Sequence, residues 1–206
     1  MGYQWTENIK CGSHHDADIK YAYALETIRQ FAQSDIWGRE TARLLEGIGP
    51  TMMGVKPASL INTRSSECVK LCKKNFDDGS PVAFVIVKAA EEKKQLFFYH
   101  KGCLQAVLSD VVNSIFLVHL GYPEYGSAEQ YVRVLAHRMR GADFPHEAGL
   151  FLGYPIKDVC GFMGARIPYQ KTMGWRMYGD TRISEVAYNR YRNARSYIRT
   201  VLRSYI

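Results

Sequence analysis

PVAFVIVKAAEEKKQLFFYHK, residues 81–101, is the stretch that decides the fold class of this chain. Two runs rich in β-branched and aromatic residues, at 81–88 and 96–101, flank a charged segment, and this arrangement predicts a β-hairpin. The first run is apolar almost throughout, so we expect a strand whose two faces are both covered by helices.

Helical periodicity surrounds the predicted hairpin. A first helix is expected at residues 18–33. A second helix should follow Ser34-Asp35 and end at Gly47, Gly49 and Pro50. A capping box predicts a helix that begins at Ser127, and further helices are expected at residues 66–76, 103–119 and 184–204. The pattern predicts an α+β fold: a mainly helical single domain packed on a small β-hairpin or short sheet.

We expect residues 1–48 to form an N-terminal helical segment packed on the domain, and residues 49–206 to form the α+β domain with a basic C-terminal helix. Leu-Gly-Tyr-Pro occurs twice, at 120–123 and 152–155, and we interpret it as one helix-end turn used twice.

Composition limits the class of protein. The chain has 206 residues, of which 47% are hydrophobic and 23% charged, as in an ordinary globular domain. No stretch of eighteen apolar residues and no secretion signal is visible, so we predict a cytoplasmic protein without a membrane span. The five cysteines fit reduced thiols, and the C-x3-C of Cys68 and Cys72 favours two buried side chains over a metal site.

Positive charge is concentrated at the C-terminus. Residues 181–206 hold six arginines and one acid, which accounts for five of the seven net positive charges. A stripe of four arginines on the last helix suggests an anionic partner, either a nucleic acid or an acidic protein: Arg192, Arg195, Arg199 and Arg203. A solvated helix face is the alternative interpretation.

Phe144-Pro-His-Glu147 is the first candidate site. His146 would act in proton transfer near neutral pH, with Glu147 as acid, base or orienting group. The alternative is that Glu147 caps free N–H groups in the first turn of a helix. Adjacent helical side chains diverge, and the second His of H-E-x-x-H is absent, so we predict no metal site here.

Lys56 is the second candidate. An extended Lys-Pro-Ala-Ser segment would direct the Lys56 ammonium and the Ser59 hydroxyl at a carboxylate or phosphate; an exposed lysine beside a turn is the alternative. Aromatic and acidic side chains that would stack on a flat cofactor, or else simply close the core, form a third group: Tyr154, Trp175, Tyr178 and Asp180. No dinucleotide, P-loop or G-x-S-x-G motif is present.

Three segments carry a family resemblance: GVKPASL at 54–60, FPHEAGLFLGYPIKDVCGF at 144–162 and GWRMYGD at 174–180. In this order and spacing they resemble an uncharacterised bacterial family of domains of unknown function, found mostly in anaerobes, and the resemblance extends from about residue 49 to the C-terminus. Genes of that family often lie near flavodoxins, so the resemblance implies an acidic redox partner for the basic helix.

Together these observations favour an accessory or enzyme-like protein of anaerobic metabolism. It would bind a small anionic or planar, cofactor-like ligand between Lys56, His146, Glu147 and Tyr154. The ligand itself is not specified by the residues, and whether the protein is an enzyme stays open. The alternatives are a nucleic-acid-binding protein that uses the arginine stripe, and a scaffold without chemistry.

Overall fold

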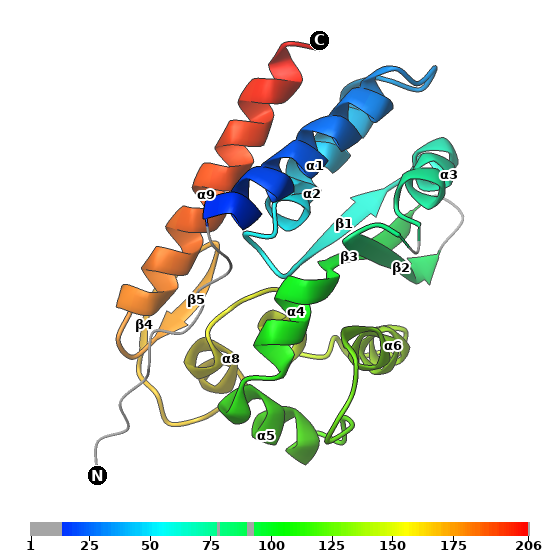
Figure 1. Ribbon diagram of the computed structural model, residues 1–206. Helices are drawn as coiled ribbons and strands as arrows, with labels where there is room; N and C mark the ends of the chain where they lie inside the picture. The colour runs from blue at the N-terminus through cyan, green and yellow to red at the C-terminus, as the bar shows by residue number, and fades with distance from the viewer. Residues whose placement is uncertain (1–13, 78, 90–92, 206) are drawn as a thin grey trace.

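The computed structural model describes residues 14–77, 79–89 and 93–205, with side chains from Tyr21 onward (Figure 1). In chain order the elements are α1 (His14–Ala32), α2 (Arg39–Met52), β1 (Ala58–Thr63), α3 (Ser66–Asn75), β2 (Val82–Ala89), β3 (Lys94–His100), α4 (Lys101–Leu108), α5 (Val111–His119), α6 (Ala128–Met139), α7 (Ala148–Phe151), α8 (Ile156–Phe162), β4 (Tyr169–Met173), β5 (Trp175–Tyr178) and α9 (Arg182–Arg203).

The predicted hairpin is present as β2 and β3, and β1 joins it to make an antiparallel sheet in the order β1-β3-β2. Ala58 of β1 lies opposite Tyr99, and Val82 of β2 lies opposite His100. β3 is therefore the central strand and is buried from Leu96 to its end. β2 is an edge strand, but the expectation that both of its faces are covered is confirmed from Val82 to Val87, because its side chains pack alternately in two hydrophobic cores. Val82 and Val87 are buried, and residues 83–86 are half-buried.

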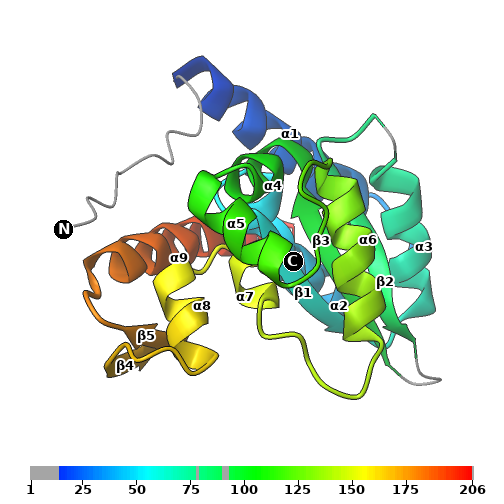
Figure 2. The same cartoon turned by 90° about the horizontal axis from the view of Figure 1, so that it is seen from below.

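The sheet separates two hydrophobic cores, because alternate β3 side chains point to opposite faces. Leu96 and Phe98 belong to the first core, with residues of α1, α2, α3 and α9, whereas Phe97 and Tyr99 belong to the second core, with residues of α4 to α8. Figures 1 and 2 show the two groups of helices on either side of the sheet. This arrangement confirms the mainly helical α+β class. Cys68 and Cys72 are buried in the first core, as expected, and burial raises the pKa of the Cys72 thiol to about 12.

The prediction that the second helix ends at Gly47, Gly49 and Pro50 was wrong, because α2 runs on to Met52 with Pro50 inside it. These glycines make room for close packing instead. A methyl group on Gly49 would lie 2.6 Å from a side-chain carbon of Ile198, so α9 lies directly against this turn of α2.

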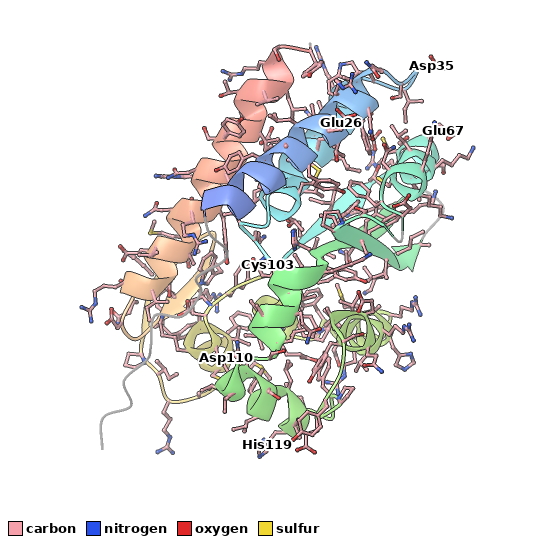
Figure 3. The ribbon with its side chains drawn as sticks, viewed as in Figure 1. Glu26, Asp35, Glu67, Cys103, Asp110 and His119 are labelled. Atoms are coloured by element: carbon pink, nitrogen blue, oxygen red, sulfur yellow. The ribbon has the colours of Figure 1, made fainter. Side chains whose placement is uncertain are left out.

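The single helix expected at 103–119 is two helices, α4 and α5, which meet at an angle of 78°. Asp110 begins α5 by accepting hydrogen bonds from the N–H groups of Val112 and Asn113. Asp110 and His119 mark the two ends of α5 at the edge of the molecule (Figure 3). No single helix of the described residues has the length and apolar character to cross a membrane; the bent α4–α5 pair passes that test on length and composition alone.

Two other expectations about turns and caps are confirmed. Ser127 and Gln130 form the predicted capping box at the start of α6. Both Leu-Gly-Tyr-Pro segments end a helix with a left-handed glycine, at φ 81° for Gly121 and 82° for Gly153. The N–H of the following tyrosine, Tyr122 or Tyr154, bonds to a carbonyl five residues back, so both turns have the same Schellman geometry.

Candidate functional site

The turn that carries Lys56 is held at both ends by backbone hydrogen bonds. The N–H groups of Val55 and Lys56 both donate to the carbonyl of Pro50, each over 2.9 Å. On the other side, the carbonyl of Pro57 accepts from the N–H of His100, also over 2.9 Å. The turn therefore fixes the origin of the lysine side chain between α2 and the sheet.

The Lys56 side chain is half-buried and lies against α9. Its Nζ is 5.7 Å from the ring centroid of Tyr191. Among the described residues it forms no ion pair or hydrogen bond, and every fully buried side-chain nitrogen or oxygen of these residues has a partner, so Nζ keeps contact with solvent. Burial, and then the nearby charge of Arg195, lowers the pKa of Lys56 to about 8.

Tyr191 belongs to a group of four aromatic residues in mutual contact, and we call Tyr154, Trp175, Tyr188 and Tyr191 the aromatic cluster. Tyr154 and Trp175 are stacked, with centroids 4.5 Å apart and planes 16° apart. The ring of Trp175 lies 6.1 Å from that of Tyr188 and 6.4 Å from that of Tyr191. All four side chains are half-buried, and they come from the α7–α8 turn, β5 and α9.

Gly153 is the point at which the distant segments meet. The Tyr191 hydroxyl donates to the Gly153 carbonyl over 2.8 Å, and a Cβ on Gly153 would lie 2.7 Å from Cδ of Pro57. No residue with a side chain fits here, both for this reason and because φ is positive. The absence of a side chain thus brings the Lys-Pro-Ala turn and the Gly-Tyr-Pro turn together.

A buried carboxylate positions the tryptophan. Asp158 of α8 accepts hydrogen bonds from Nε1 of Trp175 over 2.8 Å and from the hydroxyl of Ser184 over 2.6 Å. The ammonium of Lys157 lies 2.6 Å from the other carboxylate oxygen and also donates to Ser184 over 2.8 Å. This network links α8, β5 and the first turn of α9. Ser184 is fully buried, so the network is structural.

His146 and Glu147 lie in other surroundings. Glu147 is buried, and its carboxylate accepts from Arg138 over 2.9 Å and from the hydroxyl of Tyr122 over 3.1 Å. It stands at the N-cap of α7 but its side chain caps no N–H group, so the alternative interpretation of Glu147 as a helix cap is wrong. His146 is exposed, with its ring 4.9 Å from that of Phe162. The contacts of this pair do not lead to Lys56.

The other candidate ligand-binding residues are engaged with their own neighbours. Ser59 is buried and shares a hydrogen bond of 2.9 Å with Thr51. Tyr178 is buried at the end of β5. Asp180 is exposed, and hydrogen bonds from Arg182 lower the pKa of its carboxyl to about 2. Of the predicted ligand-binding residues, Lys56, Tyr154 and Trp175 are therefore the ones that come together.

The arginine stripe of α9 divides into two parts. Arg195 and Arg199 both donate to Glu46 of α2, over 2.9 and 2.8 Å, and together they lower the pKa of that carboxyl. Arg192 lies over the ring of Tyr188 at 5.9 Å, and Arg203 is exposed. Half of the stripe therefore holds α9 on α2, and the other half is exposed and forms no ion pair with any described residue.

The sequence interpretation missed three members of the site. Tyr188 and Tyr191 were not among the candidate residues, and Arg195 was assigned to a partner surface. Successive members of this set are three and four residues apart, which places them on one helix face and was a signal for a shared role. Their approach to Lys56 depends on the packing of α9 on α2, which no local pattern reveals.

Two other features bear on the location of a site. A surface hollow of about 420 Å³ lies between the α1–α2 loop and α3, where Asp35 and Glu67 are among its lining residues (Figure 3). Within the part of the chain that the structure describes, no group of three histidine, cysteine, aspartate or glutamate residues is arranged to hold a metal ion.

Comparison with known proteins agrees with the resemblance noted in the motifs. A family model described as a protein of unknown function, DUF3793, matches residues 44–205. No curated protein and no solved structure matches the chain. The matched range includes the Lys56 turn, the aromatic cluster and the Asp158 network. The chain therefore belongs to the DUF3793 family of proteins of unknown function.

Proposed function

We propose that the protein binds a small ligand that combines a planar ring with an anionic group, at the site formed by Lys56 and the aromatic cluster. The observation that carries the proposal is the half-buried Lys56 ammonium, which has no carboxylate partner among the described residues. A cation removed from water is unfavourable unless a counter-charge accompanies it, so an anionic ligand stabilises this position.

Arg195 strengthens the anion preference. One of its N–H groups donates to Glu46, and a guanidinium has four more to offer. Its charge is close enough to Lys56 to lower the pKa of the lysine. Two neighbouring cations, of which Arg195 alone has an acidic partner in Glu46, favour a carboxylate or phosphate between them.

The aromatic cluster supplies the planar part of the recognition. Tyr154 and Trp175 are stacked, and the edge-on ring of Tyr188 lies beside Trp175, so these half-buried rings are the part of the site that suits a flat ligand ring. The Asp158 hydrogen bond fixes the indole orientation. A preformed platform lowers the ordering cost of binding.

The binding test uses flavin mononucleotide as a probe, because it combines a planar ring with a phosphate. Quenching of flavin fluorescence measures its affinity. We expect Lys56→Met to weaken binding about 10–100-fold, the range that a charge-assisted hydrogen bond provides. Lys88→Met, at an exposed lysine of β2, is the matched control and should leave binding unchanged. Equal affinity of both variants and the wild type would contradict the proposed site.

We further propose that a flavodoxin-type acidic partner docks on the exposed part of α9. The support is the family resemblance together with Arg192 and Arg203, which form no ion pair with any described residue. Double substitution by glutamate should abolish flavodoxin binding measured by calorimetry, whereas Arg64→Glu, far along the chain and also exposed, should not. Binding of RNA in place of flavodoxin, with a steep salt dependence, would favour the nucleic-acid alternative.

A further inference from the structure

Lys56 has the surroundings of a reactive amine as well as those of an anion-binding group. The turn that carries it is fixed by the two hydrogen bonds to the Pro50 carbonyl, and its Nζ retains contact with solvent. No acidic side chain of the described residues pairs with it. Burial first, and then the neighbouring charge of Arg195, favours the neutral amine over the ammonium.

We propose that Lys56 forms an imine with the carbonyl group of an aldehyde or ketone whose planar ring lies on the aromatic cluster and whose anionic group binds Arg195. This inference rests on the proposed ligand site and names the chemical class of its ligand. The three parts of the ligand correspond to three observed parts of the site: the amine, the stacked rings and the neighbouring guanidinium.

The step balances without any co-reactant. The lone pair of the neutral amine attacks the carbonyl carbon, and a proton passes through water from nitrogen to oxygen to give a carbinolamine. A proton from solvent, equal to the one that Lys56 gave up in becoming neutral, then adds to the carbinolamine hydroxyl, so that cleavage of the carbon–oxygen bond releases one water molecule and leaves a protonated imine. Its positive charge then lies near the face of Tyr191, where the ammonium lay before, so the aromatic ring stabilises the product as well.

The titratable groups around Lys56 define its pH dependence. Tyr191 and Arg195 face it from α9, Glu46 reaches this region through its pair with Arg195, and Tyr154 lies in the adjacent turn. Burial raises the pKa values of both tyrosines, so they remain neutral. With the Lys56 pKa at about 8, the neutral amine at pH 7 is on the order of a hundred-fold more abundant than for an ordinary lysine.

The test uses the full chain and pyridoxal 5′-phosphate, a planar aldehyde that carries a phosphate. Imines are reduced with borohydride after short incubation, and peptide mapping identifies the labelled lysines. We expect Lys56 to label at least ~10-fold faster than exposed Lys88 at pH 7, in line with its larger neutral fraction. Lys56→Arg should abolish this fast phase, and Lys88→Arg should preserve it.

Arg195→Gln provides a readout that a loss of folding cannot imitate. It leaves Lys56 in place but removes the adjacent charge, so the pH midpoint of Lys56 labelling should move upward while circular dichroism remains that of the wild type. An unchanged midpoint would contradict the role of Arg195. Labelling spread evenly over exposed lysines would overturn the imine proposal itself.

Flavin mononucleotide separates this inference from the proposed function, because it carries no aldehyde or ketone that reacts with amines. If flavin mononucleotide protects Lys56 from labelling by pyridoxal 5′-phosphate, the result supports both the imine and the ligand site. Lys56-dependent flavin binding without selective labelling overturns the imine and leaves the ligand site standing. If Lys56 is labelled selectively but flavin mononucleotide does not slow the labelling, the reactive amine is supported and the planar-ligand proposal is contradicted. If neither occurs, both are wrong.

Discussion

At the scale of single residues, the position of a charge relative to its partner decides what that charge does. Glu147 is buried and has Arg138 and Tyr122 as partners, whereas Lys56 is half-buried and has the face of an aromatic ring. The first contributes to stability and the second costs stability. A charged residue whose position costs stability is a stronger indication of a binding function than a charged residue that has its partners within the fold.

Lys56→Met should therefore stabilise the free protein. We expect about 1–2 kcal/mol at pH 7, since one pKa unit corresponds to about 1.4 kcal/mol and solvent screens part of the shift. The Lys56 pKa is lower in the folded state than its ordinary value of 10.5, so the unfolded chain binds more protons between about pH 8 and 10.5. Wild-type stability rises with pH in this window, and the advantage of methionine shrinks there.

Urea unfolding of wild type and Lys56→Met at pH 7 and pH 10 measures this difference, and other titrating groups cancel in the comparison. Lys88→Met serves as the control at an exposed position. A constant difference between the two pH values would show that the lysine charge is not the cause.

The neighbours His146 and Glu147 should respond differently to substitution. Arg138→Met leaves a buried carboxylate without its charged partner, and we expect a loss of about 3 kcal/mol in unfolding free energy. Glu147→Gln retains an acceptor and should cost about 1–2 kcal/mol. His146→Ala, at an exposed ring, should change stability by less than about 0.5 kcal/mol. Thermal unfolding of the three variants tests this order.

At the scale of elements, the contact between α2 and α9 sets the position of Tyr191 and Arg195. The contact depends on Gly49, where a methyl group would meet three side-chain carbons of Ile198, including its Cβ, within 2.9 Å. Because a Cβ cannot rotate away, the helices would have to separate. Gly47, two residues earlier, would meet only the flexible end of Ile61 at such a distance.

Gly49→Ala and Gly47→Ala are therefore a matched pair. Alanine favours a helix over glycine by up to about 1 kcal/mol, so Gly47→Ala should be neutral or stabilising. Gly49→Ala should destabilise the fold by about 1–3 kcal/mol, as overpacking does, and should also weaken binding of flavin mononucleotide because α9 shifts. Similar stabilities of the two variants would show that α2 and α9 pack less closely than described.

The elements also show how far the sequence could predict the structure. Short motifs whose residues themselves favour one local structure were sufficient to predict that structure. The hairpin runs, the capping box at Ser127 and the two Leu-Gly-Tyr-Pro turns are all confirmed. The apolar period across 103–119 was misleading, because the cap of Asp110 redirects the chain while the period continues. Pro50 was misleading because it predicted a helix end too early: α2 continues through Pro50 and ends two residues later, at Met52.

Local sequence signals identified some residues of the candidate site, but not how packing brings them together. Lys56 and Tyr154 were identified from their turns, and packing brings those turns together through Gly153. The spacing of residues in a motif does not tell in which direction their side chains point: Glu147 contacts Arg138, although it precedes Tyr154 by only seven residues. Side-chain direction across the sheet is a property of tertiary packing, and a linear pattern does not contain it.

At the scale of the whole molecule, the Asp158 network joins three elements that lie around the site. Removal of the carboxylate by Asp158→Ala leaves the Lys157 ammonium without its acidic partner and frees the indole of Trp175. We expect a loss of about 3–5 kcal/mol, typical of a broken buried ion pair, and greater quenching of tryptophan fluorescence by acrylamide. Asp180→Ala removes an exposed carboxylate of the same region and should leave the unfolding midpoint unchanged.

The two cores on either side of the sheet draw on different parts of the chain. The second core is built from residues between Ala58 and Val159, whereas the first also needs Ala194, Ile198 and Leu202 of α9. During translation the ribosome therefore releases everything the second core requires well before the first can close. Until α9 emerges, the nascent chain exposes the apolar faces of α1 and α2, and it is at this stage that a chaperone would find its binding surface.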